Sequence, residues 1–221
     1  SNVEDMSFMF FGCSNIFELS VVNFITSKVK YFTSMFEADM ALTSIDVSNF
    51  DTSNAIDISG MFKDCVSLTI LNVSNFNTQQ VKNCSETFSN CNKLRFLDLS
   101  NFDTRNVEDM SSMFQFCSSV TSINLQSFDT SKVKDMFKMF QSVKSIKYLD
   151  VSKFNTKNVE DMACMFQDCN SLTSIDVSNF DTSNVIDMSY MFSMDGSLKT
   201  LDVSKFNTKK VEDMSHMFRG C

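Results

Sequence analysis

Phenylalanine recurs in this chain with a fixed period of 26 residues and no insertion. One series comprises Phe24, Phe50, Phe76, Phe102, Phe128, Phe154, Phe180 and Phe206. A second comprises Phe10, Phe36, Phe62, Phe88, Phe114, Phe140, Phe166, Phe192 and Phe218. Such a period is typical of one structural unit that is copied and stacked, because each copy buries its apolar face only against its neighbours. The sequence therefore predicts one continuous array over residues 1–221, with about eight repeats that are partial at both ends.

Charge and hydropathy limit the classes of partner. The net charge of -8 disfavours nucleic acid and acidic membrane surfaces, because both are anionic. No apolar run approaches the roughly 18 residues of a membrane span, so no membrane insertion is expected. No signal peptide is visible, and the chain begins with Ser1 in mid-repeat, which we interpret as a fragment of a longer array.

The hydrophobic period switches within each repeat. Ile175 and Val177 alternate with polar residues, which predicts a short strand with one buried face. Val185, Met188 and Phe192 follow at i, i+3 and i+7, which predicts a short helix. Strands from successive repeats run in the same direction, so they are expected to pair in parallel.

The segment from Leu172 to Phe192 has the outline L-x-x-I-x-V-x-x-F followed by D-T-S-N-V-I-D-M-S-Y-M-F, and the segment from Asn106 to Cys117 repeats its second half. This pattern resembles the BspA-like leucine-rich repeat family over essentially the whole chain. The resemblance implies an α/β solenoid: a right-handed coil with a parallel sheet on the concave face and short helices on the convex face. It also implies a cell-surface or secreted adhesin-like protein whose partner is a host or matrix protein or a glycan.

Residues at one place in the repeat line up along the stack. On the expected concave face, polar mid-strand residues and two aromatic residues form the candidate ligand-binding set: Asp46, Asn72, Phe96, Asp98, Asn124, Tyr148, Asp150, Asp176 and Asp202. Aspartate disfavours strands, and carboxylates stacked about 5 Å apart repel one another. Ligand binding and a solvated polar strip are both open interpretations of this cost.

Two further ladders have structural and functional interpretations. Threonine recurs in every repeat from Thr26 to Thr208, where a cap or turn ahead of the helix is favoured over an ice-binding array. Aspartate recurs early in the expected helix, where the helix dipole favours it. Calcium is the alternative there, but the glycine-bent loop of a calcium site is not evident. The aspartates are Asp5, Asp57, Asp109, Asp135, Asp161, Asp187 and Asp213.

One slot, three residues after the second phenylalanine, contains most of the cysteines: Cys13, Cys65, Cys91, Cys117, Cys169 and Cys221. Several of them have no cysteine in the next repeat, so the slot is interpreted as a buried thiol and not as a disulfide framework. A pair among Cys65, Cys91 and Cys117 stays open. Asp39 and Asp195 occupy the same slot, which predicts that its edge reaches solvent.

No reaction chemistry is indicated. His216 is the single histidine, so no Ser-His or Cys-His nucleophile can be assembled. Zinc is disfavoured because no C-x-x-C pair is present, and no metal or cofactor is expected. Cys164, on an outer position, is the expected reactive thiol.

The sequence thus predicts a non-enzymatic binding module with a polar concave face. A structural spacer is the alternative, and ice or mineral binding through the threonine or aspartate ladders is a third. Neither end shows a polar cap, so head-to-tail self-association is a further hypothesis.

Overall fold

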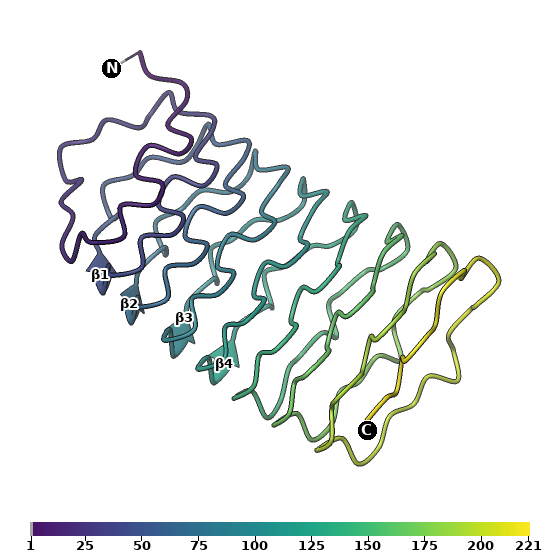
Figure 1. The fold of residues 1–221 in the computed structure, drawn as a ribbon. Coiled ribbons are helices and arrows are strands. Elements are labelled where there is room, and N and C mark those ends of the chain that lie inside the picture. Colours follow the sequence, from purple (N-terminus) through teal and green to yellow (C-terminus); the bar gives the residue numbers. More distant parts are fainter. Residues whose placement is uncertain (1) are drawn as a thin grey trace.

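The chain winds into a stack of coils that follow one another along a nearly straight axis (Figure 1). The structure, a computed structural model, describes residues 2–221. Parallel β-bridges from Asp5 to Asp213 join residues that are 26 positions apart. One coil therefore corresponds to one sequence repeat.

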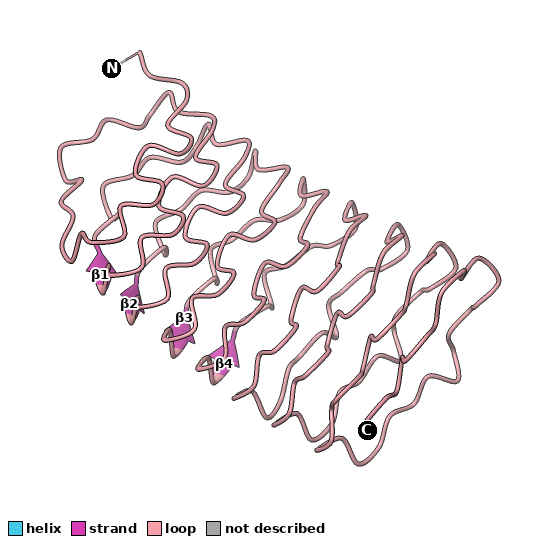
Figure 2. Ribbon diagram, in the orientation of Figure 1, coloured by secondary structure: helices cyan, strands magenta, loops and turns pink. Residues whose placement is uncertain are grey.

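Four strands of two residues each lie along one edge of the stack (Figure 2). They are β1 (Ser44–Ile45), β2 (Ile70–Leu71), β3 (Phe96–Leu97) and β4 (Ser122–Ile123). β1 pairs with β2 and β3 with β4, in parallel as predicted. The sheet is nevertheless shorter than predicted, because each strand ends where the next aspartate or asparagine closes a turn onto the backbone two residues further on.

The prediction of short helices on the convex face is wrong: the part of the chain that the structure describes contains strands and turns but no helix, and so none that could span a membrane. The reason is spacing. Coils that pair as parallel strands lie about 4.8 Å apart, whereas an α-helix with its side chains is about 10–12 Å wide. On the side where helices were expected, the stacked rings of Phe62 and Phe88 are only 6.1 Å apart. Helices cannot stack this closely. Without helices to hold the coils further apart on one side, the array is not strongly concave.

The segment that replaces the helix, residues 57–65 in one coil, is a run of overlapping turns; we call it and its equivalents the turn segment. Its backbone N–H groups alternate between two acceptors. Phe62 donates to the Thr87 carbonyl of the next coil at 3.0 Å, whereas Lys63 donates to the Gly60 carbonyl three residues earlier, also at 3.0 Å. Bonds between coils thus take the place of the i to i−4 bonds of a helix.

Two slots of each turn segment have a positive φ, and Gly60 occupies one of them with φ 61°. A Cβ at Gly60 would lie 2.8 Å from Ser34 Oγ. Gly60→Ala is therefore expected to lower the free energy of unfolding by about 1–2 kcal/mol, since a left-handed backbone disfavours a Cβ. Gly196 is the control: it has no positive φ, and the nearest atom to its Cβ would be 3.7 Å away. Gly196→Ala should be neutral or stabilising by up to about 1 kcal/mol, and equal urea midpoints for the two variants would contradict the prediction.

The second phenylalanine series forms the centre of the core. From Phe10 to Phe218, rings of successive coils stack with centroids 5.5–6.1 Å apart and planes within 15° of parallel. This separation lies within the range preferred by offset-stacked rings. The rings from Phe36 to Phe192 are fully buried. Stacking of one ring per coil explains why the period admits no insertion.

Candidate functional site

The candidate ligand-binding residues lie along β1–β4 and the equivalent stretches of later coils, and we call this surface the strand face. Its first column contains Glu18, Ser44, Ile70, Phe96, Ser122, Tyr148, Ser174 and Thr200. Its second column, two residues further along each coil, contains Asp46, Asn72, Asp98, Asn124, Asp150, Asp176 and Asp202. The structure therefore places all nine predicted residues on one surface, in two parallel columns.

The second column has a structural role. In each case Oδ1 accepts the backbone N–H of the residue two further on, at 2.9–3.1 Å. Hydrogen bonds from the serine at that position lower the pKa of five carboxyl groups: Asp46, Asp98, Asp150, Asp176 and Asp202. These bonds explain how stacked carboxylates are tolerated, and they keep the column negatively charged at neutral pH.

Turn formation does not account for three large apolar side chains in the first column. Ile70, Phe96 and Tyr148 are 69%, 65% and 68% exposed. Ile70 and Phe96 lie in successive coils, and Tyr148 lies two coils beyond Phe96. Sequence reasoning missed Ile70, although it replaces the serine or threonine of the same slot and carries the same signal as the two aromatic residues.

A family model matches the chain over residues 1–95, 57–172 and 138–221, which together span its length. The description of that family is "Mycoplasma protein of unknown function, DUF285". The chain belongs to the DUF285 family. No curated protein matches its sequence.

Solved structures similar to this DUF285 chain are bacterial leucine-rich repeat proteins, the class that the BspA-like resemblance implied. A T. pallidum leucine-rich repeat protein is 20% identical with a TM-score of 0.42, and the match covers 63% of this chain and 58% of that protein. One from Eubacterium ventriosum is 15% identical with a TM-score of 0.43, covering 96% and 78%. A leucine rich cell surface protein from Faecalibacterium prausnitzii is 15% identical with a TM-score of 0.32, covering 89% and 69%.

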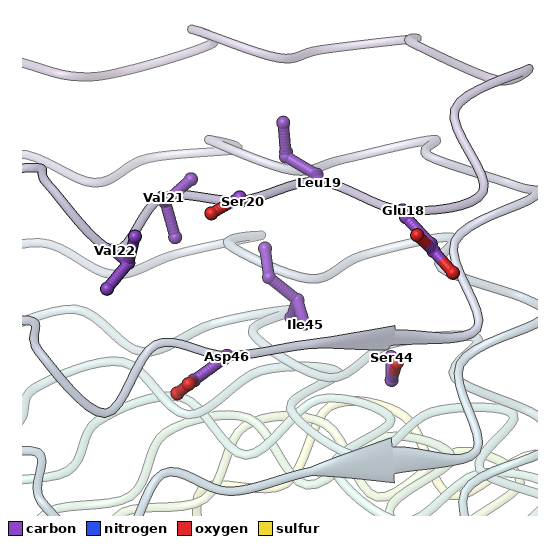
Figure 3. Close-up of a pocket in the computed structure, with 8 residues that line it drawn as sticks. All are labelled: Glu18, Leu19, Ser20, Val21, Val22, Ser44, Ile45 and Asp46. Carbon is purple, nitrogen blue, oxygen red and sulfur yellow. The ribbon is translucent and has the colours of Figure 1, made fainter.

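At the N-terminal end of the strand face, a hollow of about 460 Å³ opens between two successive coils of the DUF285 array (Figure 3). Glu18 and Ser20 line it from one coil, and Ser44 and Asp46 line it from the next. Aliphatic side chains complete the lining: Leu19, Val21, Val22 and Ile45. Two carboxyl groups beside an apolar surface suit a ligand that carries both a cationic and an apolar group. Sequence reasoning did not single out Glu18 or Ser20.

The threonine ladder lies inside the array. Side chains from Thr26 to Thr182 are at most 2% exposed. Thr104 Oγ1 donates to the Asp129 carbonyl of the next coil at 2.9 Å and accepts the Asp129 N–H at 2.8 Å. The helix-cap part of the interpretation is wrong, because no helix follows within the described residues. The turn part is confirmed: the Val107 N–H donates to the Thr104 carbonyl at 2.9 Å, and the hydroxyl satisfies a backbone N–H. Ice binding through this ladder is also wrong, because these hydroxyl groups are covered.

The aspartate ladder of the turn segment closes turns as well. Asp109 Oδ1, for example, accepts the N–H of Ser111 at 2.8 Å. The predicted interaction with a helix dipole is wrong, because no helix lies on this side of the described chain. Burial raises the pKa of Asp135 to about 6, with neighbouring carboxyl groups adding to the effect. Among residues 2–221, no group of three or more His, Cys, Asp or Glu side chains is arranged to hold a metal ion.

All eight cysteines are free thiols, so the pairing left open among Cys65, Cys91 and Cys117 is not formed. In the shared slot the thiol donates across coils: Cys91 Sγ lies 3.0 Å from the Phe62 carbonyl. Cys164 is buried, and burial raises its pKa, so the expectation of a reactive outer thiol is wrong.

Proposed function

We propose that this DUF285 array is a non-enzymatic, protein-binding repeat module displayed at the cell surface, and that its strand face holds the partner. The observation that supports the proposal is the exposure of Ile70, Phe96 and Tyr148, each beside a second-column residue whose Oδ1 closes a turn. Exposed aromatic residues of this kind anchor protein interfaces.

The charge beside these side chains narrows the kind of partner. The second column presents ionised aspartates, with the exposed Phe96 beside Asp98 and Tyr148 beside Asp150. A partner that offers apolar groups to the first column and basic groups to the second would be complementary. A protein segment provides both, which favours a protein over a neutral glycan. The cell-surface location is part of the proposal and follows the BspA-like resemblance of the repeat.

Replacing both aromatic residues by serine, the residue that the slot contains in other coils, tests the proposal. Phe96→Ser with Tyr148→Ser is expected to weaken binding by about 30- to 700-fold, since each anchor contributes roughly 1–2 kcal/mol. Surface plasmon resonance against a panel of soluble extracellular-matrix proteins and matrix glycans measures the effect. Phe116→Ser is the control, because Phe116 is 44% exposed but lies in a turn segment.

Retained binding in the double variant, or an equal loss in the control, would contradict a partner site on the strand face. An array that binds no member of the panel would favour the structural-spacer alternative. Selective binding of the glycans would replace the protein partner by a carbohydrate.

A further inference from the structure

Two coils have a carboxyl group in a slot that contains a thiol in six coils and the valine Val143 in one. Asp39 and Asp195 are 1% and 0% exposed, so the prediction that this slot reaches solvent is wrong. In five of the coils with a thiol, the thiol donates to one fixed acceptor, the carbonyl of a phenylalanine 29 residues earlier. Cys169 Sγ, for example, donates to the Phe140 carbonyl at 3.1 Å. The equivalent acceptors for Asp39 and Asp195 are the carbonyls of Phe10 and Phe166.

Each of the two carboxyl groups has one oxygen without a hydrogen-bond partner. Asp195 Oδ1 accepts the backbone N–H of Cys169 at 2.7 Å, but its Oδ2 is buried and unpaired. Asp39 Oδ1 is likewise buried and unpaired. Ser193 Oγ, in the same coil as Asp195, is a further buried oxygen without a partner. A carboxylate only accepts hydrogen bonds, so in the ionised form it cannot replace the thiol as a donor, whereas a neutral carboxyl group has an O–H that can.

We propose that Asp39 and Asp195 are carried as neutral carboxylic acids that donate to the carbonyls of Phe10 and Phe166, and that their ionisation loosens the coils around them. The array then contains two pH-sensitive contacts between coils, one toward each end of the described chain. The proposal does not depend on the strand face or on its partner.

The groups around Asp195 do not stabilise its ionised form. The thiols of Cys169 and Cys221 flank it in the adjacent coils, and the carboxylate of Asp168 is already paired with Lys144 Nζ at 2.8 Å. Burial raises the pKa of Asp195 to about 8, opposed by the hydrogen bond from the Cys169 backbone.

Asp39 lies in a similar setting between Cys13 and Cys65. Glu37 and Asp64 are the other acidic groups near the Cys65 thiol, and Glu37 is 3.7 Å from Lys63 Nζ. Burial raises the pKa of Asp39 to about 6, opposed by a hydrogen bond from the Cys13 backbone.

The direction of the pH effect follows from these values. Both pKa values are raised above the ordinary value of 3.8. The stabilising contribution is therefore fully present below pH 3.8 and is lost as the pH rises, through about 6 for Asp39 and about 8 for Asp195. Asp135, like Asp39, has a pKa raised to about 6. The buried thiols, whose pKa values are raised above 9.0, add a further loss of stability as the pH approaches 9. The interval from pH 7 to about pH 8 therefore reports on Asp195.

Unfolding midpoints measured from pH 4 to pH 9 test the proposal in the intact array. Asp195→Asn supplies an amide donor at every pH, and Asp195→Cys restores the usual thiol. Both variants are expected to lose most of the fall in midpoint that the wild-type array shows between pH 7 and about pH 8. Asp176→Asn is the control, because this exposed carboxyl group has a lowered pKa and should leave the profile unchanged.

A measurement on the unmodified array covers the case in which a variant fails to fold. With ¹³C-labelled aspartate, NMR is expected to show a carboxyl signal that titrates near pH 8 and is missing from the variant that folds. An Asp195 signal that titrates below pH 5 would overturn the proposal. So would an Asp195→Cys array that keeps the wild-type pH profile.

Discussion

Phe114→Ala is expected to lower the free energy of unfolding by about 3–5 kcal/mol, the largest effect of a single substitution in this array. The ring of Phe114 is fully buried and stacks on Phe88 at 5.9 Å and on Phe140 at 5.5 Å. Removing it opens a cavity that two coils share. The backbone on both sides is hydrogen-bonded between coils, so the array cannot collapse to fill the space. Urea unfolding monitored by circular dichroism measures the loss.

Phe116→Ala is the matched control for this prediction. Phe116 belongs to the same coil but is 44% exposed, and alanine tolerates the positive φ of this slot, as Ala38 shows at an equivalent position. This variant should lose less than about 1 kcal/mol of the free energy of unfolding. If the two variants unfolded at the same denaturant concentration, the phenylalanine column would not be the centre of the core.

Thr104→Val is expected to destabilise the array by about 2–4 kcal/mol, although valine has nearly the same shape as threonine. The hydroxyl of Thr104 both donates to and accepts from the backbone of Asp129. Valine leaves that N–H and that carbonyl without their partner in a partly buried position, and each unsatisfied group costs about 1–3 kcal/mol. Differential scanning calorimetry of the variant checks this value.

Two controls separate the hydroxyl group from the rest of the side chain. Thr104→Ser keeps both hydrogen bonds and removes one methyl group, so a loss of about 1 kcal/mol is expected. Thr208→Val changes the exposed last member of the ladder and should be close to neutral. A Thr104→Val array as stable as the wild type would mean that the bonds between coils are not held by this ladder.

The helix prediction failed because it took no account of the distance between neighbouring coils. Val185, Met188 and Phe192 do face the core, as their spacing indicates, and all three are fully buried. Spacing within one repeat, however, reports only which residues are buried. It does not report how far apart neighbouring repeats lie. The narrow separation of stacked phenylalanines excludes a helix, and the same apolar pattern is accommodated by turns whose N–H groups bond alternately within and between coils.

In the candidate site, too, some features could be predicted from the sequence and others could not. Phe96 and Tyr148 could be predicted, because each breaks a serine pattern at a slot that alternation places outside. The turn made by Asp98 could not be assigned from the sequence, because a carboxylate that binds a ligand and one that accepts its own backbone N–H look alike there. Asp195 is the opposite case, since a charged residue suggests solvent and only the coordinates show that the coils bury it.

From the sequence alone came the period, the stacking of identical units, their parallel direction and the identity of the core columns, because an uninterrupted repeat places equivalent side chains one above another. Only the tertiary structure decided that the coils lie too close together for helices, that threonine and aspartate bond across and within coils, and that two carboxyl groups are buried. The physical reason is that hydrogen-bond partners 25 to 29 residues away are brought into contact only when the coils have stacked.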